Sequence, residues 1–443
     1  MRSDRGGNRP LTEVHMALKR YAQVGTGGRA RMYYEAVASK YSDIACMVGF
    51  CDQSQTRMNY ANSRLEELGA KKVPTYLPHE FEKMIKETKP DIVIVTSVDR
   101  THDDYICRAM EAGCDVITEK PLTIDERKAQ RIIDTQKKTG KHIRVTFNYR
   151  YAPYHTKVRE LIRDGAIGTP TSVHFEWLLN TEHGADYYRR WHRNKYNSGG
   201  LLVHKATHHF DLVNFWLGTE PETVFGFGSL QFYGRAAAEK RGVEKFYYRC
   251  HGSEEAKDDP FAIDLESNPT LKALYLDAEA DSGYIRDRSV FSDDISIEDT
   301  MNLVVRYKNG VQMSYSLNSY MPWEGFNVMI NGTKGRLEYH SVERPYINAG
   351  GDKKDEGALK YSSIRVYPMF GDPYDVSVKT GEGGHGGGDP VMLDDVFLDN
   401  PPYDEFHRAA DFHDGVESIL VGIAGNKAIA SGLPVNVDSL IHW

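Results

Sequence analysis

The chain opens its first regular segment with Tyr21-Ala22-Gln23-Val24-Gly25-Thr26-Gly27-Gly28-Arg29-Ala30. A short apolar run ends at Val24, and a glycine-rich turn leads into a segment of helical periodicity from Ala30. In such a strand–turn–helix unit the first glycine permits a tight turn, and the second lets the backbone approach a pyrophosphate. The small last residue allows the helix to pack closely on the strand. A single glycine motif is a weak signal, so its meaning depends on the surrounding sequence.

The sequence that follows alternates short apolar runs with longer segments of helical period as far as Arg150. The runs are Tyr21–Val24, Cys46–Cys51, Asp91–Thr96, Asp115–Thr118 and Arg144–Phe147, and the helical segments include Arg57–Leu68, Glu80–Thr88, His102–Ala112 and Asp125–Thr139. Strands that are apolar on both faces and alternate with helices predict a doubly wound parallel sheet. We therefore expect an N-terminal Rossmann domain at residues 19–150, after an arm at 1–18.

Strand-like segments dominate after Tyr151. They are Ser172–Leu179, Val224–Phe232, Met301–Tyr307, Val311–Leu317, Asn327–Ile330 and Gly335–Tyr339. In Val311–Leu317 apolar and polar residues alternate, and Asn309-Gly310 before it is a hairpin turn. The fold class is therefore α/β: a Rossmann domain followed by an α+β domain at 151–443 with a large open, mostly antiparallel sheet. An insertion of weak regular structure is expected at 235–299, a glycine-rich loop at 381–388 and a helix at about 409–430.

Composition excludes several classes of function. The 443 residues carry a net charge of −8, with 40% hydrophobic and 27% charged residues, and the basic residues are scattered. This pattern lacks the positive patch of a nucleic-acid-binding protein. No apolar run approaches membrane-spanning length, and five cysteines form no CxxC pair. We expect a cytoplasmic protein that binds neither nucleic acid nor membrane.

The acid Asp52 follows the second predicted strand, where a dinucleotide-binding domain holds the ribose hydroxyls. It also suits a helix cap, since a helix is expected to begin near Ser54. Because a carboxylate repels a 2′-phosphate, we expect NAD rather than NADP, although Arg29 and Arg57 lie nearby. The expected cofactor-binding residues are Gly25, Thr26, Gly27, Gly28, Arg29, Asp52, Thr96, Ser97, His102, Glu119 and Lys120.

Several of these segments together resemble the glucose–fructose oxidoreductase/inositol dehydrogenase/rhizopine-catabolism (Gfo/Idh/MocA) family. The resemblance rests on Gly25–Ala30, Asp52, Thr96–His102, Ala112-Gly113, Glu119-Lys120-Pro121, Phe147–Tyr151 and Ser198–Gly218, and it spans about residues 19–340. It implies an NAD(P)-dependent oxidoreductase that acts on sugars, cyclitols or related polyols. It further implies that the open sheet joins subunits into a homodimer or homotetramer.

The resemblance also implies catalytic roles. Lys120 takes the place of the lysine that contacts both the nicotinamide ribose and the reacting hydroxyl, and an ammonium there stabilises developing alkoxide charge. His208 matches the general acid/base, and Asp211 matches the acid that follows it. His204 departs from the family, which has an aspartate in that place. An imidazole near Lys120 and His208 is expected to stay neutral, and it either relays the proton or hydrogen-bonds a sugar hydroxyl.

Further residues are candidates for substrate contact. They are Asn148, Arg150, Tyr151, Trp191 and His192, together with His204 and His208. For the first three a structural role between domains is an equal alternative, and Trp191 equally suits a core position. The segment Gly384–Asp389 suits either a mobile loop over the substrate or a flexible connector.

Two other functions compete with a dehydrogenase acting on a carbohydrate or cyclitol. Some relatives oxidise a ring hydroxyl, eliminate a glycosidic group and then reduce the ring, so NAD is recycled and a glycoside is cleaved. A metal-dependent hydrolase would use His204, His208 and Asp211 as ligands. The zinc-protease motif, however, needs a glutamate after its first histidine, and Lys205 stands there. We therefore expect no metal site.

Overall fold

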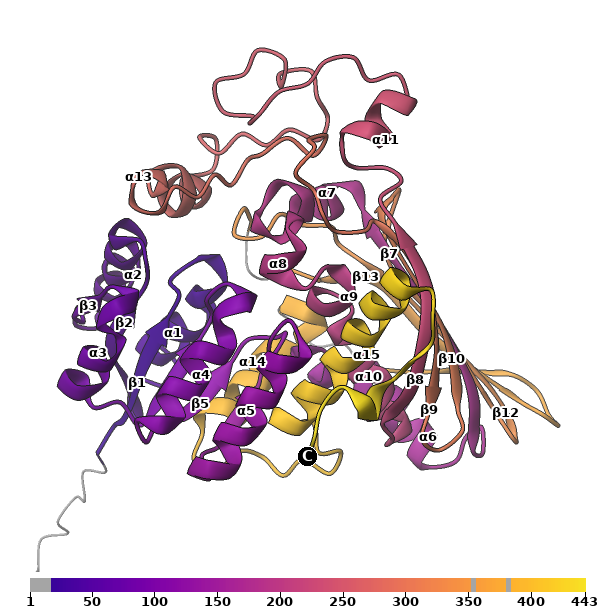
Figure 1. Cartoon of the computed structure of the whole chain (residues 1–443). Coiled ribbons are helices and arrows are strands. Elements are labelled where there is room, and N and C mark those ends of the chain that lie inside the picture. Colours follow the sequence, from indigo (N-terminus) through magenta and orange to yellow (C-terminus); the bar gives the residue numbers. More distant parts are fainter. Residues whose placement is uncertain (1–16, 352–355, 380–383) are drawn as a thin grey trace, which may run out of the picture.

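The structure is a computed structural model that describes residues 17–351, 356–379 and 384–443. Almost the whole of the predicted arm at 1–18, and residues 381–383 of the predicted glycine-rich loop, lie outside these ranges. Two sheets form the framework (Figure 1). The first has seven strands and the second has nine.

The first sheet has the strand order β15-β6-β5-β4-β1-β2-β3. Its strands are β1 (Lys19–Val24), β2 (Ala45–Cys51), β3 (Thr75–Tyr76), β4 (Ile92–Val95), β5 (Asp115–Thr118), β6 (Ile143–Val145) and β15 (Ala410–Asp411). The six strands of the N-terminal part run parallel, and only β15 is antiparallel to its neighbour. The strand order reverses between β1 and β4, which is where doubly wound sheets bind ligands.

Five helices alternate with these strands. They are α1 (Arg31–Ala38), α2 (Gln55–Glu67), α3 (Phe81–Thr88), α4 (His102–Glu111) and α5 (Glu126–Thr139). The predicted doubly wound domain is therefore confirmed. The chain also returns to it from its far end, because Phe397 packs on Tyr21 and Tyr41 and β15 extends the sheet.

The second sheet has the order β14-β13-β12-β11-β7-β10-β9-β8-β16. Its strands are β7 (Pro170–Asn180), β8 (Pro221–Ser229), β9 (Thr300–Tyr307), β10 (Gln312–Met321), β11 (Glu324–Gly332), β12 (Gly335–Glu343), β13 (Leu359–Pro368), β14 (Tyr374–Val376) and β16 (Val435–Asn436). Neighbours are antiparallel except β7 and β10. This confirms the predicted open, mostly antiparallel sheet.

The alternation predicted for β10 sets which face of this sheet is buried. Met313, Tyr315 and Leu317 are buried, whereas Gln312 and Ser314 are exposed. The buried face packs against helices of the same domain: α15 packs on β8, α6 on β13 and α7 on β7 and β10. These helices are α6 (Pro153–Arg163), α7 (Thr181–Arg189) and α15 (Phe412–Ser431), with α8 (Lys195–Ser198), α9 (Leu201–His204) and α10 (Thr207–Leu217) beside them.

Residues 235–299 lie between β8 and β9 and arch over both domains (Figure 1). Their regular structure is short: α11 (Arg235–Lys240), α12 (Pro269–Leu271), a π-helical turn (Lys272–Leu276) and α13 (Glu279–Ser282). The arch begins at α11 above the second domain and brings α13 next to α2 of the first domain. We call this segment the arch.

The glycine-rich segment differs from the predicted loop. Its described part has three consecutive positive φ angles, at His385, Gly386 and Gly387, and runs directly into the helix α14 (Gly384–Phe397). Gly384–Gly388 is buried, because the backbone packs tightly on the chain at Asn148 and Tyr151. The described part of the predicted loop is therefore non-helical at His385, Gly386 and Gly387, but it is buried against other segments of the chain.

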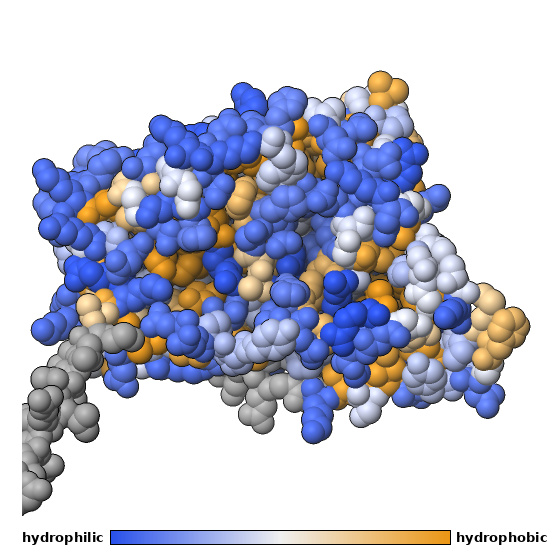
Figure 2. All heavy atoms as spheres, turned by 90° about the horizontal axis from the view of Figure 1, so that it is seen from below, coloured by the Kyte–Doolittle hydropathy of each residue, from blue (hydrophilic) through white to orange (hydrophobic). Residues whose placement is uncertain are grey.

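Hydrophilic residues cover most of the face seen in Figure 2, and apolar residues show between them. Among the described residues, no helix combines the length and the apolar character needed to cross a membrane.

Candidate active site

A cavity of about 500 Å³ lies between the two domains, at the carboxyl ends of the parallel strands. The glycine turn, Asp52 and the Thr96–His102 segment line it from the first domain. His192, His204 and His208 line it from the second domain, and the arch contributes further residues. Most of the residues predicted to form the site therefore face one space.

The glycine turn has the shape that a pyrophosphate needs. Gly25 has φ +83°, and a Cβ there would lie 2.7 Å from the Cα of Ser97, so a side chain is excluded. Gly27 and Gly28 open onto the cavity, and the chain continues through a short turn into α1. Backbone N–H groups at a helix start favour an anion, and that of Gly28 already donates to the Tyr275 hydroxyl at 3.2 Å. The turn therefore fits the pyrophosphate of a dinucleotide.

Asp52 both supports this turn and faces the cavity. Its Oδ2 accepts hydrogen bonds from the backbone N of Thr26 at 2.6 Å and from Thr26 Oγ1 at 3.1 Å. The helix cap is instead Ser54, whose hydroxyl accepts from the backbone N of Arg57. The guanidinium of Arg57 lies 3.9 Å from Asp52 Oδ1, and its buried Nη2 has no partner among the described residues.

Thr96, Ser97 and His102 line the cavity, and their side chains form hydrogen bonds with neighbouring segments that also line it or lie beside it. Thr96 Oγ1 donates to the carbonyl of Gly25 at 2.7 Å, and Ser97 Oγ lies 2.8 Å from Thr101 Oγ1. The His102 ring bridges the carbonyls of Pro121 and Ser97 at 2.9 and 3.1 Å. Burial lowers the pKa of this imidazole.

Glu119 and Lys120 end β5 at the cavity. The Glu119 carboxylate accepts hydrogen bonds from Arg29 Nε and the Tyr33 hydroxyl, both at 2.6 Å. Burial raises the pKa of Glu119, but Arg29 and Tyr33 lower it by a larger amount, so the net shift is downward. Burial lowers the pKa of Lys120 to about 8, and the charge of Lys205 adds to this effect. The Lys120–Pro121 peptide bond is cis.

His204 and His208 lie on two separate helices. α9 ends at His204, and α10 begins at Thr207 with His208 in its first turn. Both imidazoles still line the cavity, and Lys120 Nζ donates to the carbonyl of His204 at 3.3 Å.

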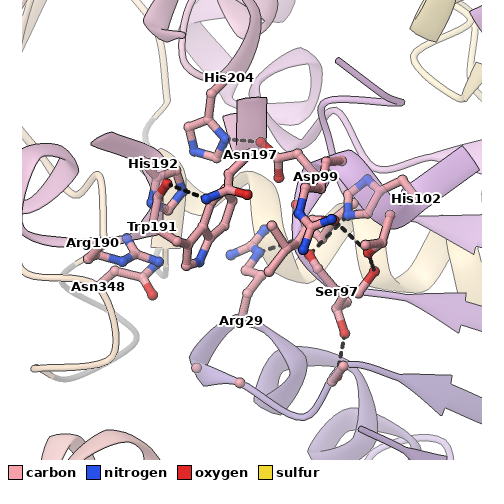
Figure 3. A pocket seen from close by; sticks show the side chains of 18 of the residues that line it. Arg29, Ser97, Asp99, His102, Arg190, Trp191, His192, Asn197, His204 and Asn348 are labelled. Atoms are coloured by element: carbon pink, nitrogen blue, oxygen red, sulfur yellow. Dashed lines mark hydrogen bonds and ion pairs between the residues drawn. The ribbon is translucent and has the colours of Figure 1, made fainter. Parts of the chain in front are cut away.

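Burial and the nearby Lys120 ammonium lower the pKa of both histidines well below the ordinary value. His204 Nδ1 lies 2.6 Å from Asp99 Oδ2, and burial raises the pKa of that carboxyl well above its usual range (Figure 3). The His208 ring stacks on Tyr149 with 4.5 Å between centroids, and its buried Nδ1 has no partner among the described residues. Both imidazoles are therefore neutral near pH 7, as expected from the charge of Lys120.

Trp191 and His192 also line the cavity, beside Arg190 (Figure 3). His192 and His204 are in edge contact, with 4.2 Å between ring centroids. Burial, together with the charge of Arg190, lowers the pKa of His192 well below its ordinary value.

Sequence reasoning missed Lys205 as a residue of the site. Its ammonium lies 4.5 Å from the ring centroid of Trp177, and burial lowers its pKa, opposed by the charges of Glu324 and Glu343. His183 also lines the cavity, with Nδ1 2.6 Å from Glu324 Oε1. Lys205 lies between His204 and His208 in the sequence, and this position was the signal from which its place in the site could have been predicted.

Three residues predicted to contact substrate do not line this cavity. The Asn148 amide donates to Asp389, and the Tyr151 hydroxyl donates to Asp395. Arg150 forms a buried bidentate pair with Asp211, at 2.8 and 2.6 Å. These contacts favour the structural alternative for all three residues, because their side chains join the end of the first domain to α10 and α14.

The same pairing removes Asp211 from the cavity. Asp211 lies on the buried side of α10 next to Arg150, whereas His204 and His208 face the cavity. The three proposed ligands of a metal-dependent hydrolase do not converge. Across the described ranges, Glu220, His413 and Glu417 form the group with metal-ligand spacing, away from this cavity.

A cationic lysine and neutral imidazoles beside a dinucleotide-binding turn suit the removal of a proton from an alcohol oxygen and of a hydride from the carbon that bears it. The fold and the site thus define a dinucleotide-dependent oxidoreductase. Residues 19–147 match the description "Oxidoreductase family, NAD-binding Rossmann fold", and residues 159–437 match "Oxidoreductase family, C-terminal alpha/beta domain". The chain belongs to the Gfo/Idh/MocA oxidoreductase family, and its N-terminal domain is an NAD-binding Rossmann domain.

Two relatives and one solved structure illustrate its similarities. YteT of Bacillus subtilis, whose name describes an oxidoreductase, is 36% identical over 96% of this chain and 99% of its own length. The D-glucoside 3-dehydrogenase of Escherichia coli is 26% identical over 51% of this chain and 59% of its own length. The WlbA dehydrogenase of Bordetella pertussis, solved with NADH and UDP-GlcNAcA, has a TM-score of 0.62 at 16% identity, covering 95% and 99% of the two chains. The last comparison shows the fold alone.

Proposed function

We propose that the protein is an NAD-dependent dehydrogenase that transfers hydride between a secondary hydroxyl of a sugar, glycoside or cyclitol and nicotinamide. The observation that carries this proposal is that Lys120 and His208 line one cavity with the glycine turn. Relatives named as D-glucoside 3-dehydrogenase and myo-inositol 2-dehydrogenase support the substrate class.

The proposed mechanism assigns separate tasks to the two groups. Bound NAD supplies the hydride acceptor. Lys120, with a pKa of about 8, carries a proton at neutral pH and stabilises negative charge on the carbinol oxygen. His208 is neutral at this pH because its pKa lies well below the ordinary value. Its ring therefore accepts the hydroxyl proton of the substrate as the carbonyl forms.

His204 is proposed to hold a substrate hydroxyl rather than to remove its proton. Asp99 fixes the ring through Nδ1, and the other nitrogen is left for a ligand in the cavity. Trp191 and His192 are proposed to line the same subsite. The cofactor is proposed to rest on Gly27 and Gly28, with its adenosine ribose toward Asp52.

Asp52 favours NAD over NADP in this proposal, because a carboxylate beside the ribose repels a 2′-phosphate. Thr26 and Ser54 already donate to this carboxylate, which holds it in place. Titration with each nucleotide tests the preference. Tighter binding of NADP than of NAD would contradict it.

A panel of sugars, glycosides and inositols, followed by NADH absorbance, tests the function. His208→Ala is expected to lower kcat by about 10²–10⁴-fold, the usual contribution of a general base. Lys120→Ala is expected to lose turnover as well, whereas the exposed His142→Ala serves as control. Absence of turnover on every polyol would reject the proposal. Aglycone release without net NADH would instead identify the glycoside-cleaving alternative.

A further inference from the structure

The arch meets the glycine turn at Tyr275. The backbone N–H of Gly28 donates to the Tyr275 hydroxyl at 3.2 Å, and Tyr275 lines the cavity. No described residue accepts the hydrogen of this hydroxyl. A phenol that accepts from the turn and keeps its own hydrogen is placed to donate to an anion resting on the same turn.

Further contacts tie the arch to the first domain just outside the cavity. Asp281 Oδ2 accepts hydrogen bonds from Ser54 Oγ and from the backbone N of Thr56, both at 2.8 Å. Arg57 Nε donates to the carbonyl of Leu274 at 2.8 Å. The arch therefore crosses the edge of the sheet where the predicted adenosine ribose lies.

A short distance further along the chain, the arch is held more firmly in the second domain. Arg286 and Asp186 form a bidentate ion pair at 2.8 and 2.9 Å, and both side chains are almost completely buried. Asp281 is exposed, so its hydrogen bonds compete with water. The contact of Asp281 is thus a weaker attachment than the buried ion pair, and it is the one expected to open first.

We propose that residues 271–284 of the arch are part of the dinucleotide site and retain the cofactor. Tyr275 donates a hydrogen bond to the pyrophosphate, and the contacts of Asp281 and Leu274 separate before the dinucleotide leaves. The proposal rests on the proposed function, since it requires that the dinucleotide bind at the glycine turn.

The dissociation rate of NADH tests this proposal in the full-length protein. Protein loaded with NADH is mixed with excess NAD, and the loss of bound-NADH fluorescence is followed by stopped flow. Tyr275→Phe is expected to speed dissociation about 10-fold or more, the effect of losing one hydrogen bond to a charged group. Asp281→Asn is expected to speed it about 2–3-fold, because an exposed contact contributes less.

Two substitutions in the same arch serve as matched controls. Tyr248→Phe removes the hydroxyl of an exposed tyrosine, and Asp258→Asn neutralises an exposed acid. Both are expected to leave the rate unchanged. Circular dichroism and melting temperature establish that each variant is folded.

The failures of the two proposals are distinguishable. If the wild type binds no NADH, the proposed cofactor is wrong. If the wild type binds NADH but folded Tyr275→Phe releases it at the wild-type rate, only the role of the arch is overturned. Hydrogen exchange supplies a second readout: NADH is expected to slow exchange in 271–284, and unchanged exchange there would also overturn the proposal.

Discussion

Lys120 keeps an ammonium group where burial disfavours charge. Its pKa is lowered from 10.5 to about 8, chiefly by desolvation, while Glu119 and Asp99 oppose the shift. A group whose charged form is less stable in the folded state than in the unfolded state reduces stability. The residue proposed to stabilise the alkoxide is therefore expected to weaken the fold.

Replacing this ammonium is expected to stabilise the protein while abolishing turnover. Between pH 8 and pH 10.5 the unfolded chain binds more protons at Lys120 than the folded chain, so the penalty is complete below pH 8 and disappears as pH rises to 10.5. Lys120→Met is expected to gain up to about 3 kcal/mol at pH 7, at about 1.36 kcal/mol per pKa unit. Urea unfolding at pH 7 and pH 10 measures the difference. An equal gain in the free energy of unfolding at pH 7 and pH 10 would show that the buried charge of Lys120 is not its cause.

At the scale of elements, the β1–α1 turn depends on one glycine that no other residue can replace. Gly25→Ala places a Cβ 2.7 Å from backbone atoms of Thr96 and Ser97 at a positive φ. We expect it to abolish NADH binding and to destabilise the first domain, because backbone atoms at both sides of the turn must shift. Fluorescence titration and thermal melting check this.

Gly113→Ala is the matched control for that substitution. Its φ is +90°, but nothing lies within 4 Å of the added Cβ. It is expected to cost about 1–2 kcal/mol from the left-handed conformation alone, with NADH binding intact. Equal loss of binding in both variants would show that strain, and not the shape of the turn, is responsible.

Arg150 joins the 3-10 turn after β6 to α10 and α15. It pairs with Asp211 and also lies 3.0 Å from Asp414, while only 3% of its side chain is exposed. Arg150→Ala leaves a buried carboxylate without its partner and is expected to cost about 3–5 kcal/mol. The exposed Arg163→Ala, in an ion pair with Asp164, is expected to cost less than about 1 kcal/mol. Unfolding by urea measures both, and a raised KM with unchanged stability in Arg150→Ala would restore the substrate role.

At the scale of the whole molecule, the helices described in the second domain pack on one face of the nine-stranded sheet, and no helix among the described residues covers the other face. Phe225 on β8 lies directly across from Val304 on β9, and the nearby Phe227 is 70% exposed. An apolar patch on an open sheet is typical of a surface that another chain covers. We propose that a second copy of this chain packs on it.

Val304→Lys is expected to shift the protein toward monomers, because it places a charge in the apolar patch. Light scattering coupled to gel filtration measures the mass. Leu433→Lys, which alters an exposed apolar residue between α15 and β16, serves as control. A wild type that is already monomeric, or a mass unchanged by Val304→Lys, would contradict the proposal.

Local patterns in the sequence were enough to predict both sheets. The alternation of apolar and polar residues in β10 reports which face is buried, and the apolar strands of the first domain report burial on both faces. The glycine turn follows β1 and Glu119-Lys120 follow β5 of one parallel sheet, with β4 between them, and the carboxyl ends of these strands meet at one edge. Such residues were found because their positions follow from the elements that carry them.

Contacts between distant segments could not be found in this way. Arg150 seemed equally suited to substrate and to structure until folding brought Asp211 and Asp414 beside it. Lys205 lies in the break between α9 and α10 and lines the cavity, and no local pattern in the sequence predicted either feature.

The sequence by itself determined the fold class and the cofactor turn, because periodicity and strand ends act over a few residues. That Lys120 and His208 act together was implied by the resemblance of their motifs to the family. Only the tertiary structure decided where the arch lies. Asp281 and Ser54 are 227 residues apart, and no local preference encodes a hydrogen bond between them. Such contacts form only when the buried core has set the positions of both segments, since each alone is too weak to bring them together.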